Sequence, residues 1–471
     1  MSLERSANRS EDENTDMVGY LRNGYPHLLE LIFGQLVSFE TFLDMQGVSR
    51  WEAALLPVWK THWQRHMKDH GWRALSSRIE HRDPALVKHA TCRDTTDYRD
   101  LCVRISDSFW QIKKNIENGS SQKSQAAIID IFKDPDDSFS VQNVVLNHQH
   151  IFAVLSTVGG WKIKMFNRWT LTPLSSRNFK STIGNLQLNR HVVVFQCGWG
   201  SSSYLEVLDV NTLKHLETIY RGSIVLPPHI QDNGSCFFLT EDQLYYFQLV
   251  HDNSRHICHA FVGVLRLHPY KGRFAEVETF SFSYKSQHPH YDPRIYVDDK
   301  YLILDSFEEN EDRYRHVQAR CVKTAKLVRQ HHFRRHDAIE REYKNGIIMA
   351  LAQVNYFRFI VAWDVHNNRV EGVIHHAVSI SSHVISASMN HFPEYQMVYC
   401  KHRCKMQIIS KETKDSSKSK LWSKIRWLGT KKYFNFDPSG SIALERILYC
   451  DGIQVIGTSR LGEKLIVLDL I

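Results

Sequence analysis

Hydrophobic residues follow two different patterns along the chain, and the change falls near residue 125. Before it, apolar residues recur three and four positions apart, as on one face of a helix. After it, short apolar and β-branched runs alternate with Gly, Asn, Asp, Ser and Pro. The pattern predicts a small helical part followed by an all-β domain over residues 126–471.

The densest helical pattern lies in residues 21–63, where three short apolar stripes follow one another. The first stripe consists of Leu28, Leu29, Ile32, Phe33 and Leu36. The others consist of Phe39, Phe42 and Leu43, and of Trp51, Leu55, Val58, Trp59 and Trp63. Helices this short cannot bury all of this surface against one another. We expect the remainder to meet another protein; the alternative is that the helices only cap the next domain.

A helical linker is predicted over residues 64–125. Its first stripe is Trp72, Leu75 and Ile79, and its second, less regular set is Leu101, Val103, Ile105 and Trp110. A run of Asn, Gly and Ser over residues 118–124 predicts a flexible joint, and hence the domain boundary.

One unit recurs in the β part: a strand, a polar turn and a returning strand. Its seven copies begin at Ile163, Leu205, Gly263, Ala319, Ile360, Met406 and Leu465. Successive copies begin 41 to 59 residues apart, which brackets the period of a four-stranded propeller blade. The sequence therefore predicts a mainly β protein with a seven-bladed propeller, six and eight blades remaining open.

The last copy lacks a returning strand, while residues 126–132 form an apolar run with no partner in the first copy. We expect this run to supply the outer strand of the final blade and so close the ring. Ala362-Trp363-Asp364 resembles the signature dipeptide of WD repeats, and Val207-Leu208-Asp209 resembles it more weakly.

Residues 25–59 resemble an F-box, with Tyr25 where that family has Leu and Ser49 where it has Cys. The resemblance is carried by an initial Pro, paired apolar positions and a closing Trp at residue 59. It implies an α-helical F-box that docks on a Skp-type adaptor, and through it on a cullin–RING ubiquitin ligase. The residues implied in adaptor binding are Pro26, Leu28, Leu29, Ile32, Phe33, Leu36, Phe42, Leu43, Val48 and Trp51. The segment 97–119 is similar to the linker helix that precedes the propeller in F-box proteins.

Composition narrows the compartment and the partners. Nine scattered cysteines, an odd number, favour a reducing compartment over a disulfide framework. Residues 1–20 are polar and predict a disordered tail without a signal core, and no apolar run approaches the roughly 18 residues of a membrane span. We therefore expect a cytoplasmic or nuclear protein with no membrane partner. The net charge of +8 is mild for this length and does not by itself indicate nucleic acid.

Candidate chemistry is sparse, which argues against an enzyme. Gly159-Gly160 and Gly198-Trp199-Gly200 are too short to cradle a phosphate. Cys400, His402 and Cys404 lack the fourth ligand and the spacing of a structural zinc site. No nucleophile elbow or metalloprotease motif is present. We expect no catalytic residue, metal or cofactor.

The leading hypothesis is a substrate-recognition subunit of a Skp–cullin–F-box ubiquitin ligase, whose propeller binds an unidentified target protein. Trp161 and Trp199, in predicted turns, are the candidates for a target-binding face. One alternative is a protein-interaction scaffold without a ligase. Another is an RNA- or phospholipid-binding propeller that uses the basic run 411–432 with Trp422 and Trp427. That run is better read as a solvated loop beside blade tryptophans, so nucleic acid is the less favoured partner.

Overall fold

The computed structural model of this chain describes most of the predicted elements. The described residues are 25–32, 52–67, 70–84, 95–118, 126–130, 140–198, 203–220, 230–252, 257–268, 273–285, 294–298, 300–308, 314–334, 341–344, 347–354, 357–375, 384–388, 395–400, 405–410, 426–427, 431–435, 446–450, 453–459 and 464–469. They fall into two compact units that divide the chain after Lys114.

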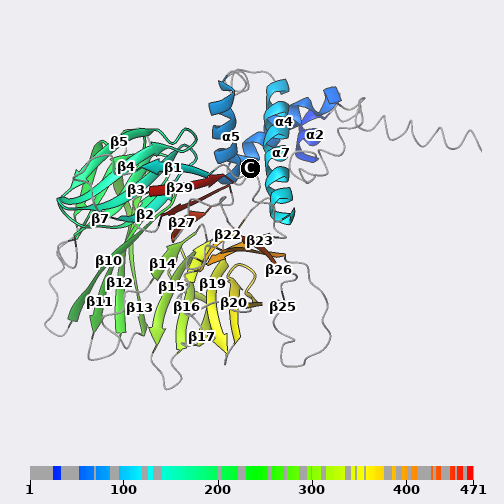
Figure 1. The fold of residues 1–471 in the computed structure, drawn as a ribbon. Helices are drawn as coiled ribbons and strands as arrows, with labels where there is room; N and C mark the ends of the chain where they lie inside the picture. Colours follow the sequence, from blue (N-terminus) through cyan, green and yellow to red (C-terminus); the bar gives the residue numbers. More distant parts are fainter. Residues whose placement is uncertain are drawn as a thin grey trace, which may run out of the picture. The chain divides into compact units, whose positions relative to one another are not determined.

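The first unit is helical. Its helices are α2 (Pro26–Leu31), α4 (Glu52–His66), α5 (His70–Arg82) and α7 (Thr95–Asn118) (Figure 1). Helix α4 corresponds to the third predicted stripe, and α7 corresponds closely to the predicted linker helix over residues 97–119. The second predicted stripe, at Phe39, Phe42 and Leu43, lies outside the described residues.

The core of this unit corrects one prediction about α7. Its buried residues are Val58, Trp59, Trp72, Leu75, Leu101, Ile105, Phe109 and Ile112. Leu101, Ile105 and Phe109 are four residues apart and share one helix face. Trp110, which the sequence analysis grouped with Leu101 and Ile105, is instead 59% exposed, because one further residue turns it away from that face.

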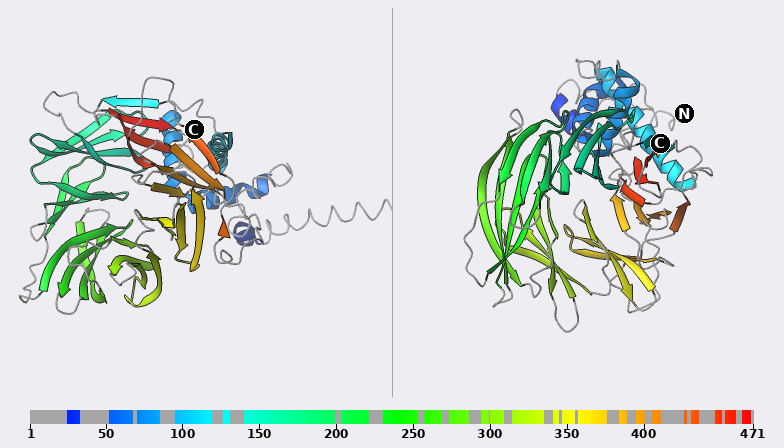
Figure 2. Two further views of the ribbon diagram at one scale, coloured as in Figure 1. Left: turned by 60° about the horizontal axis from the view of Figure 1, so that its bottom comes forward. Right: turned by 60° about the vertical axis from the view of Figure 1, so that its left-hand side comes forward.

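The second unit is built from seven antiparallel sheets among the described residues (Figures 1 and 2). Sheet 1 contains β2 (Val141–Leu146), β3 (His150–Thr157), β4 (Gly160–Asn167) and β5 (Pro173–Phe179). Sheet 2 contains β6 (Ile183–Leu188), β7 (Val192–Cys197), β8 (Tyr204–Asp209) and β9 (His215–Tyr220). Sheet 3 contains β10 (Ile230–Leu239), β11 (Gln243–Asp252), β12 (Ile257–His268) and β13 (Arg273–Lys285). Sheet 4 contains β14 (Arg294–Val297), β15 (Tyr301–Glu308), β16 (Tyr314–Cys321) and β17 (Leu327–Arg334).

The remaining three sheets follow the same antiparallel plan, with two additions. Sheet 5 contains β18 (Arg341–Lys344), β19 (Ile347–Val354), β20 (Phe357–Asp364) and β21 (Arg369–His375), and β25 (Arg426–Trp427) joins it parallel to β21. Sheet 6 contains β22 (Val384–Ser388), β23 (Tyr395–Cys400), β24 (Lys405–Ser410) and β26 (Lys431–Asn435). The seventh sheet contains β27 (Arg446–Cys450), β28 (Gln454–Thr458), β29 (Lys464–Asp469) and β1 (Ala126–Asp130). It is here called the closing sheet, because it pairs β1 with β29.

Every predicted copy of the repeat begins in the third strand of a sheet. These strands are β4, β8, β12, β16, β20, β24 and β29. The returning strand of the sixth copy is β26, Lys431–Asn435, which pairs with β24. The seventh copy pairs with β1, with Ala126 opposite Leu468 and Asp130 opposite Lys464. This is the position that the sequence analysis gave to residues 126–132, of which 131 and 132 lie outside the described residues.

Consecutive sheets pack face to face through separate apolar clusters. One cluster joins the closing sheet to sheet 1 through Leu465, Ile456 and Val144, and others join sheets 1 and 2, 2 and 3, 3 and 4, and 4 and 5. The first strands of sheets 5 and 6, of sheet 6 and the closing sheet, and of the closing sheet and sheet 1 contact each other. Because both faces of the inner strands are covered, their sequences read as continuous apolar runs. Successive four-stranded sheets packed in this way form a β-propeller.

Candidate functional site

Only the beginning of the predicted adaptor-binding stretch is described. Helix α2 begins at Pro26, and the Leu28 amide donates to the Tyr25 carbonyl oxygen at 3.0 Å. Tyr25 is 42% exposed and Leu31 is 45% exposed, while Leu28 and Ile32 are half-buried. Leu29 lies in α2. The other residues predicted to bind the adaptor lie outside the described residues: Phe33, Leu36, Phe42, Leu43, Val48 and Trp51.

Stacked and edge-on aromatic rings connect the three helices α4, α5 and α7 that follow this stretch. The His66 ring stacks on Trp72 with a centroid distance of 4.6 Å and an interplanar angle of 17°. Trp63 lies edge-on to Trp72 at 6.5 Å and 6.0 Å from Tyr98. These contacts join α4, α5 and α7, and α2 in turn contacts α4. Aromatic pairs add to the stability that burial alone provides, so α2 contacts a helix, α4, that is itself firmly packed.

Strand order gives each sheet two different ends. The first–second and third–fourth turns lie at one end, here called the turn end. The second–third turn and the connection to the next sheet lie at the other, here called the connection end. Hydrogen bonds show both groupings: the Arg168 amide donates to the Gln149 carbonyl at the turn end, and the Gly198 amide donates to the Thr182 carbonyl at the connection end.

Turns at the turn end are held by short polar side chains. Asn147 Oδ1 accepts from the amides of Gln149 and His150, and Asn189 Oδ1 accepts equivalently in sheet 2. Asp209 Oδ1 accepts from two amides in the third–fourth turn of sheet 2. Asn and Asp favour such turns because their side chains bond the backbone two residues ahead.

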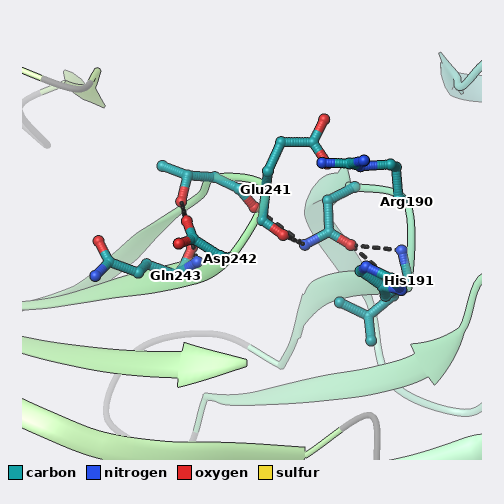
Figure 3. A network of polar contacts seen from close by, with 8 residues as sticks. Arg190, His191, Glu241, Asp242 and Gln243 are labelled. Atoms are coloured by element: carbon teal, nitrogen blue, oxygen red, sulfur yellow. Dashed lines mark hydrogen bonds and ion pairs between the residues drawn. The ribbon is translucent and has the colours of Figure 1, made fainter. Parts of the chain in front are cut away.

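Polar contacts also cross between sheets at the turn end. Asn189 Nδ2 donates to the carbonyl oxygens of Thr240 and Glu241, and Arg190 Nε lies 2.9 Å from Glu241 Oε2 (Figure 3). Arg168 is fully buried and donates through Nε to Gln454 Oε1 of the closing sheet at 2.9 Å.

A third crossing at this end joins sheets 4 and 5. His366 Nε2 lies 3.1 Å from Asp298 Oδ2, the carboxylate whose other oxygen accepts from the Tyr301 amide. The polar groups of the turn end are therefore committed to holding turns and sheets together.

The connection end of sheets 1 and 2 carries aromatic and aliphatic side chains. Val158 is 71% exposed and Tyr220 is 76% exposed. Trp161 lies in strand β4 opposite Phe179, one residue beyond the strand's start, and not in a turn as predicted. It is half-buried against the cluster between the two sheets. Trp199 lies outside the described residues.

Two pairs of rings lie at this end, and Phe179 and Tyr204 pack against the same apolar cluster between the sheets. Phe179 meets Phe195 edge-on at 5.0 Å, and Tyr204 lies 5.9 Å from Tyr220, its cross-strand partner. The turn before Trp161 requires glycine: Gly160 has φ +137°, and a Cβ there would lie 2.4 Å from the Phe179 carbonyl oxygen. Sequence reasoning missed Val158, Tyr204 and Tyr220, because only the strand register reveals that these residues reach the same end.

Buried thiols in the β unit are held protonated. Burial raises the pKa of Cys197 to about 12, with the Glu206 carboxylate adding to the shift, and burial raises the pKa of Cys258 to about 11. A thiol must ionise to act as a nucleophile, so neither suits covalent catalysis near neutral pH. Glu206 Oε1 accepts from the Thr218 hydroxyl at 3.3 Å, and Glu206 Oε2 lies 3.2 Å from His215 Nε2.

No cluster of three His, Cys, Asp or Glu residues suited to a metal ion occurs in the part of the chain that the structure describes. Cys400 ends strand β23, while His402 and Cys404 lie outside the described residues. No described helix is long and apolar enough to cross a bilayer. Of the basic run, the described part is Arg426 and Trp427 in β25 and Lys431 and Lys432 in β26.

Comparison with known proteins gives matches to solved structures, WD40 domains among them. No protein-family model matches the chain, and no curated protein matches its sequence. A chain of the mitotic checkpoint complex matches with a TM-score of 0.42 and 12% identity, over 73% of this chain and 90% of that chain.

Two WD40 domains match at similar levels. The domain of Toxoplasma gondii coronin gives a TM-score of 0.42 and 8% identity, over 74% of this chain and 86% of that chain. The domain of fission yeast SCAP gives 0.36 and 11% identity, over 73% and 98%. The propeller assignment itself rests on the strand pairing and packing described above.

Proposed function

We propose that the chain is the substrate-recognition subunit of a Skp–cullin–F-box ubiquitin ligase. The observation that carries the proposal is the F-box-like pattern that starts with helix α2 at Pro26. Leu28, Leu29 and Ile32 follow in a pattern that resembles the family's, with the spacing from Pro26 to Ile32 one residue shorter. Exposed Tyr25 and Leu31 leave apolar surface at the same short helix. A packed helical body and a separate β unit come next, the domain order expected of such a receptor.

In this proposal the seven sheets are the seven blades of a closed propeller. The pairing of β1 with β29 supports closure, as do the apolar clusters and first-strand contacts between neighbouring sheets. A closed ring hides sheet edges and gives a rigid base for a binding face.

The proposed subunit performs no covalent chemistry itself. The ligase works by proximity: the receptor holds a target lysine near an activated ubiquitin, which replaces a bimolecular encounter by an intramolecular one. The helical body then sets the reach between adaptor and target. This role agrees with buried, protonated thiols at Cys197 and Cys258.

Co-purification of the full chain with a Skp-type adaptor tests the proposal. We expect the wild-type chain to form a stable complex on size exclusion, and Leu29→Asp with Ile32→Asp to abolish it, because charges in a buried apolar interface are costly. Val277→Asp, an exposed site in the β unit, is the matched control and should bind normally. Failure of the folded wild-type chain to capture any adaptor would favour the scaffold alternative.

A further inference from the structure

The ends of sheets 1 and 2 differ in what they expose. In the turns at the turn end, the exposed residues are all polar: Thr170, Thr172, Arg190, His191, Asn211, Thr212 and Lys214. The exposed apolar residues nearest this end are Pro173 and Leu174, at the start of β5. At the connection end, Val158 and Tyr220 are among the most exposed large apolar side chains of the described residues. Exposed apolar side chains that gather at one end of a scaffold mark an interaction surface.

Val158 and Tyr220 border one surface that spans both sheets. Val158 tips the β3–β4 turn next to Trp161, and Trp161 pairs with Phe179. Phe179, Trp161 and Tyr204 pack on the same cluster between the sheets, and Tyr204 continues to Tyr220. We call Val158, Trp161, Phe179, Tyr204 and Tyr220 the aromatic ridge. Half-buried aromatic residues backed by a packed core are the usual anchors of protein interfaces.

Charge at the aromatic ridge is one-sided. Lys180 follows Phe179 directly and is exposed. At the connection end of sheets 1 and 2, the acidic side chain that the described residues supply is Glu206, which is half-buried and held by Thr218 and His215. A partner that places an acidic group beside Lys180 gains attraction, whereas a basic partner meets like charge.

We propose that the aromatic ridge binds a segment of the target protein that carries aliphatic or aromatic side chains next to acidic residues. This inference rests on the proposed function, because it names the chemistry of the target that the receptor recognises. Among the described residues of this end, one exposed lysine, Lys180, stands beside the aromatic rings. That is not the array of cations that a phosphate backbone needs, so a protein segment is the occupant that fits.

Peptide binding to the full-length chain tests this proposal. Three sets of fluorescent 15-residue peptides share the same Leu and Phe positions and differ in carrying Asp/Glu, Lys/Arg or Ser/Gln between them. We expect the acidic set to bind about tenfold more tightly than the basic set. Val158→Asp combined with Tyr220→Asp should weaken the acidic set at least about tenfold, the effect of losing interface anchors. Lys180→Glu should weaken it about threefold, more at low salt.

Leu174→Asp is the matched control, because Leu174 is 49% exposed on β5 near the turn end of sheet 1. It should bind the acidic set within about twofold of wild type. Equal affinity for acidic and basic sets, or ridge variants that bind like wild type while circular dichroism shows them folded, would overturn the proposal. Adaptor capture by the same variants separates the two ideas: a failed ridge leaves it intact, while a failed F-box abolishes it and leaves peptide binding unchanged.

Discussion

His150 sits buried at the turn end of sheet 1, where its amide is bound by Asn147 and its ring meets Phe152 edge-on at 6.0 Å. Burial lowers the pKa of this imidazole, and the Asp209 carboxylate of sheet 2 opposes that shift. The neutral ring is therefore the form that the folded protein accommodates. The cost of charging it appears as a dependence of stability on pH.

The first prediction concerns that dependence. Because the folded-state pKa of His150 lies below its unfolded value, the unfolded chain binds more protons as pH falls through about 6.5. The free energy of unfolding should then fall with pH from about 7 toward 5. His150→Gln should reduce this slope, measured from urea midpoints at pH 7.5 and 5.5, even if it lowers stability by about 1–2 kcal/mol at both. An unchanged slope would show that His150 does not contribute to the pH dependence of stability.

Cysteine reactivity supplies a second prediction. The Thr324 hydroxyl lowers the pKa of the Cys321 thiol by hydrogen bonding, whereas burial raises the pKa of Cys197 to about 12 and of Cys258 to about 11. At pH 8, iodoacetamide should label Cys321 well before the other two, as read by peptide mass spectrometry. Thr324→Val should slow that labelling. Fast labelling of Cys197 in folded protein would contradict the burial assigned to it.

At the scale of secondary-structure elements, the fourth, outer strands of sheets 1 to 4 share a local irregularity. Each fourth strand carries one extra residue close to its start, opposite no partner in the third strand. These bulged residues are Leu174 in β5, Leu216 in β9, Val277 in β13 and Val328 in β17. A bulge increases local twist and disturbs the outer edge of a sheet, which discourages pairing with another chain.

Burial in β13 gives the third prediction. Val277 is half exposed, so Val277→Lys should change stability by no more than about 0.5 kcal/mol. Phe274 is instead buried between sheets 2 and 3, and its amide donates to the Glu217 carboxylate. Phe274→Ala should lower the free energy of unfolding by about 3–5 kcal/mol, the cost of truncating a buried Phe, as measured by denaturant unfolding. Equal stability of Val277→Lys and Phe274→Ala would contradict the burial assigned to Phe274.

Apolar runs such as Tyr204–Asp209 predicted the third strand of each sheet, because each of these strands is an inner strand with a paired neighbour on either side. The bulges and the short β25 strand gave no such signal, since they depend on which residue faces which across the sheet. Helix α7 shows the same limit. The less regular apolar set and the resemblance to a linker helix predicted this helix, but the choice of Phe109 over Trp110 as the buried ring depends on its neighbours, Trp72 among them.

The candidate site was harder to predict than the fold for the same reason. Trp161 was predicted to lie in a turn at a target-binding face, and the structure places it in β4 at the connection end. Val158 and Tyr220 are ordinary residues of a turn and a strand end, and their exposure is a property of the assembled sheets. The proposal that Leu29 and Ile32 bind an adaptor comes from the sequence alone, because the apolar pattern of an F-box is local to a short segment.

For the whole molecule, the closing sheet supplies the fourth prediction. Ala127 and Val467 are Cα partners in the β1–β29 pairing. Ala127→Cys with Val467→Cys should form an intramolecular disulfide on oxidation, seen as a gel shift, and should raise stability by about 2–4 kcal/mol because it constrains the unfolded chain. The control is Ala127→Cys with Tyr220→Cys, which should form no intramolecular disulfide because these two residues lie in different sheets. Cross-links only between molecules would argue that β1 pairs elsewhere.

The same pairing has a consequence for protein synthesis. Strand β1 leaves the ribosome first among the strands, yet its partner β29 comes more than 300 residues later. At roughly 5–20 residues per second, β1 waits on the order of half a minute with the apolar run Ala126–Asp130 unpaired. The helices of the first unit can fold during that interval, whereas the closing sheet cannot. Premature termination before residue 464 would leave β1 permanently without its partner, a ready signal for quality control.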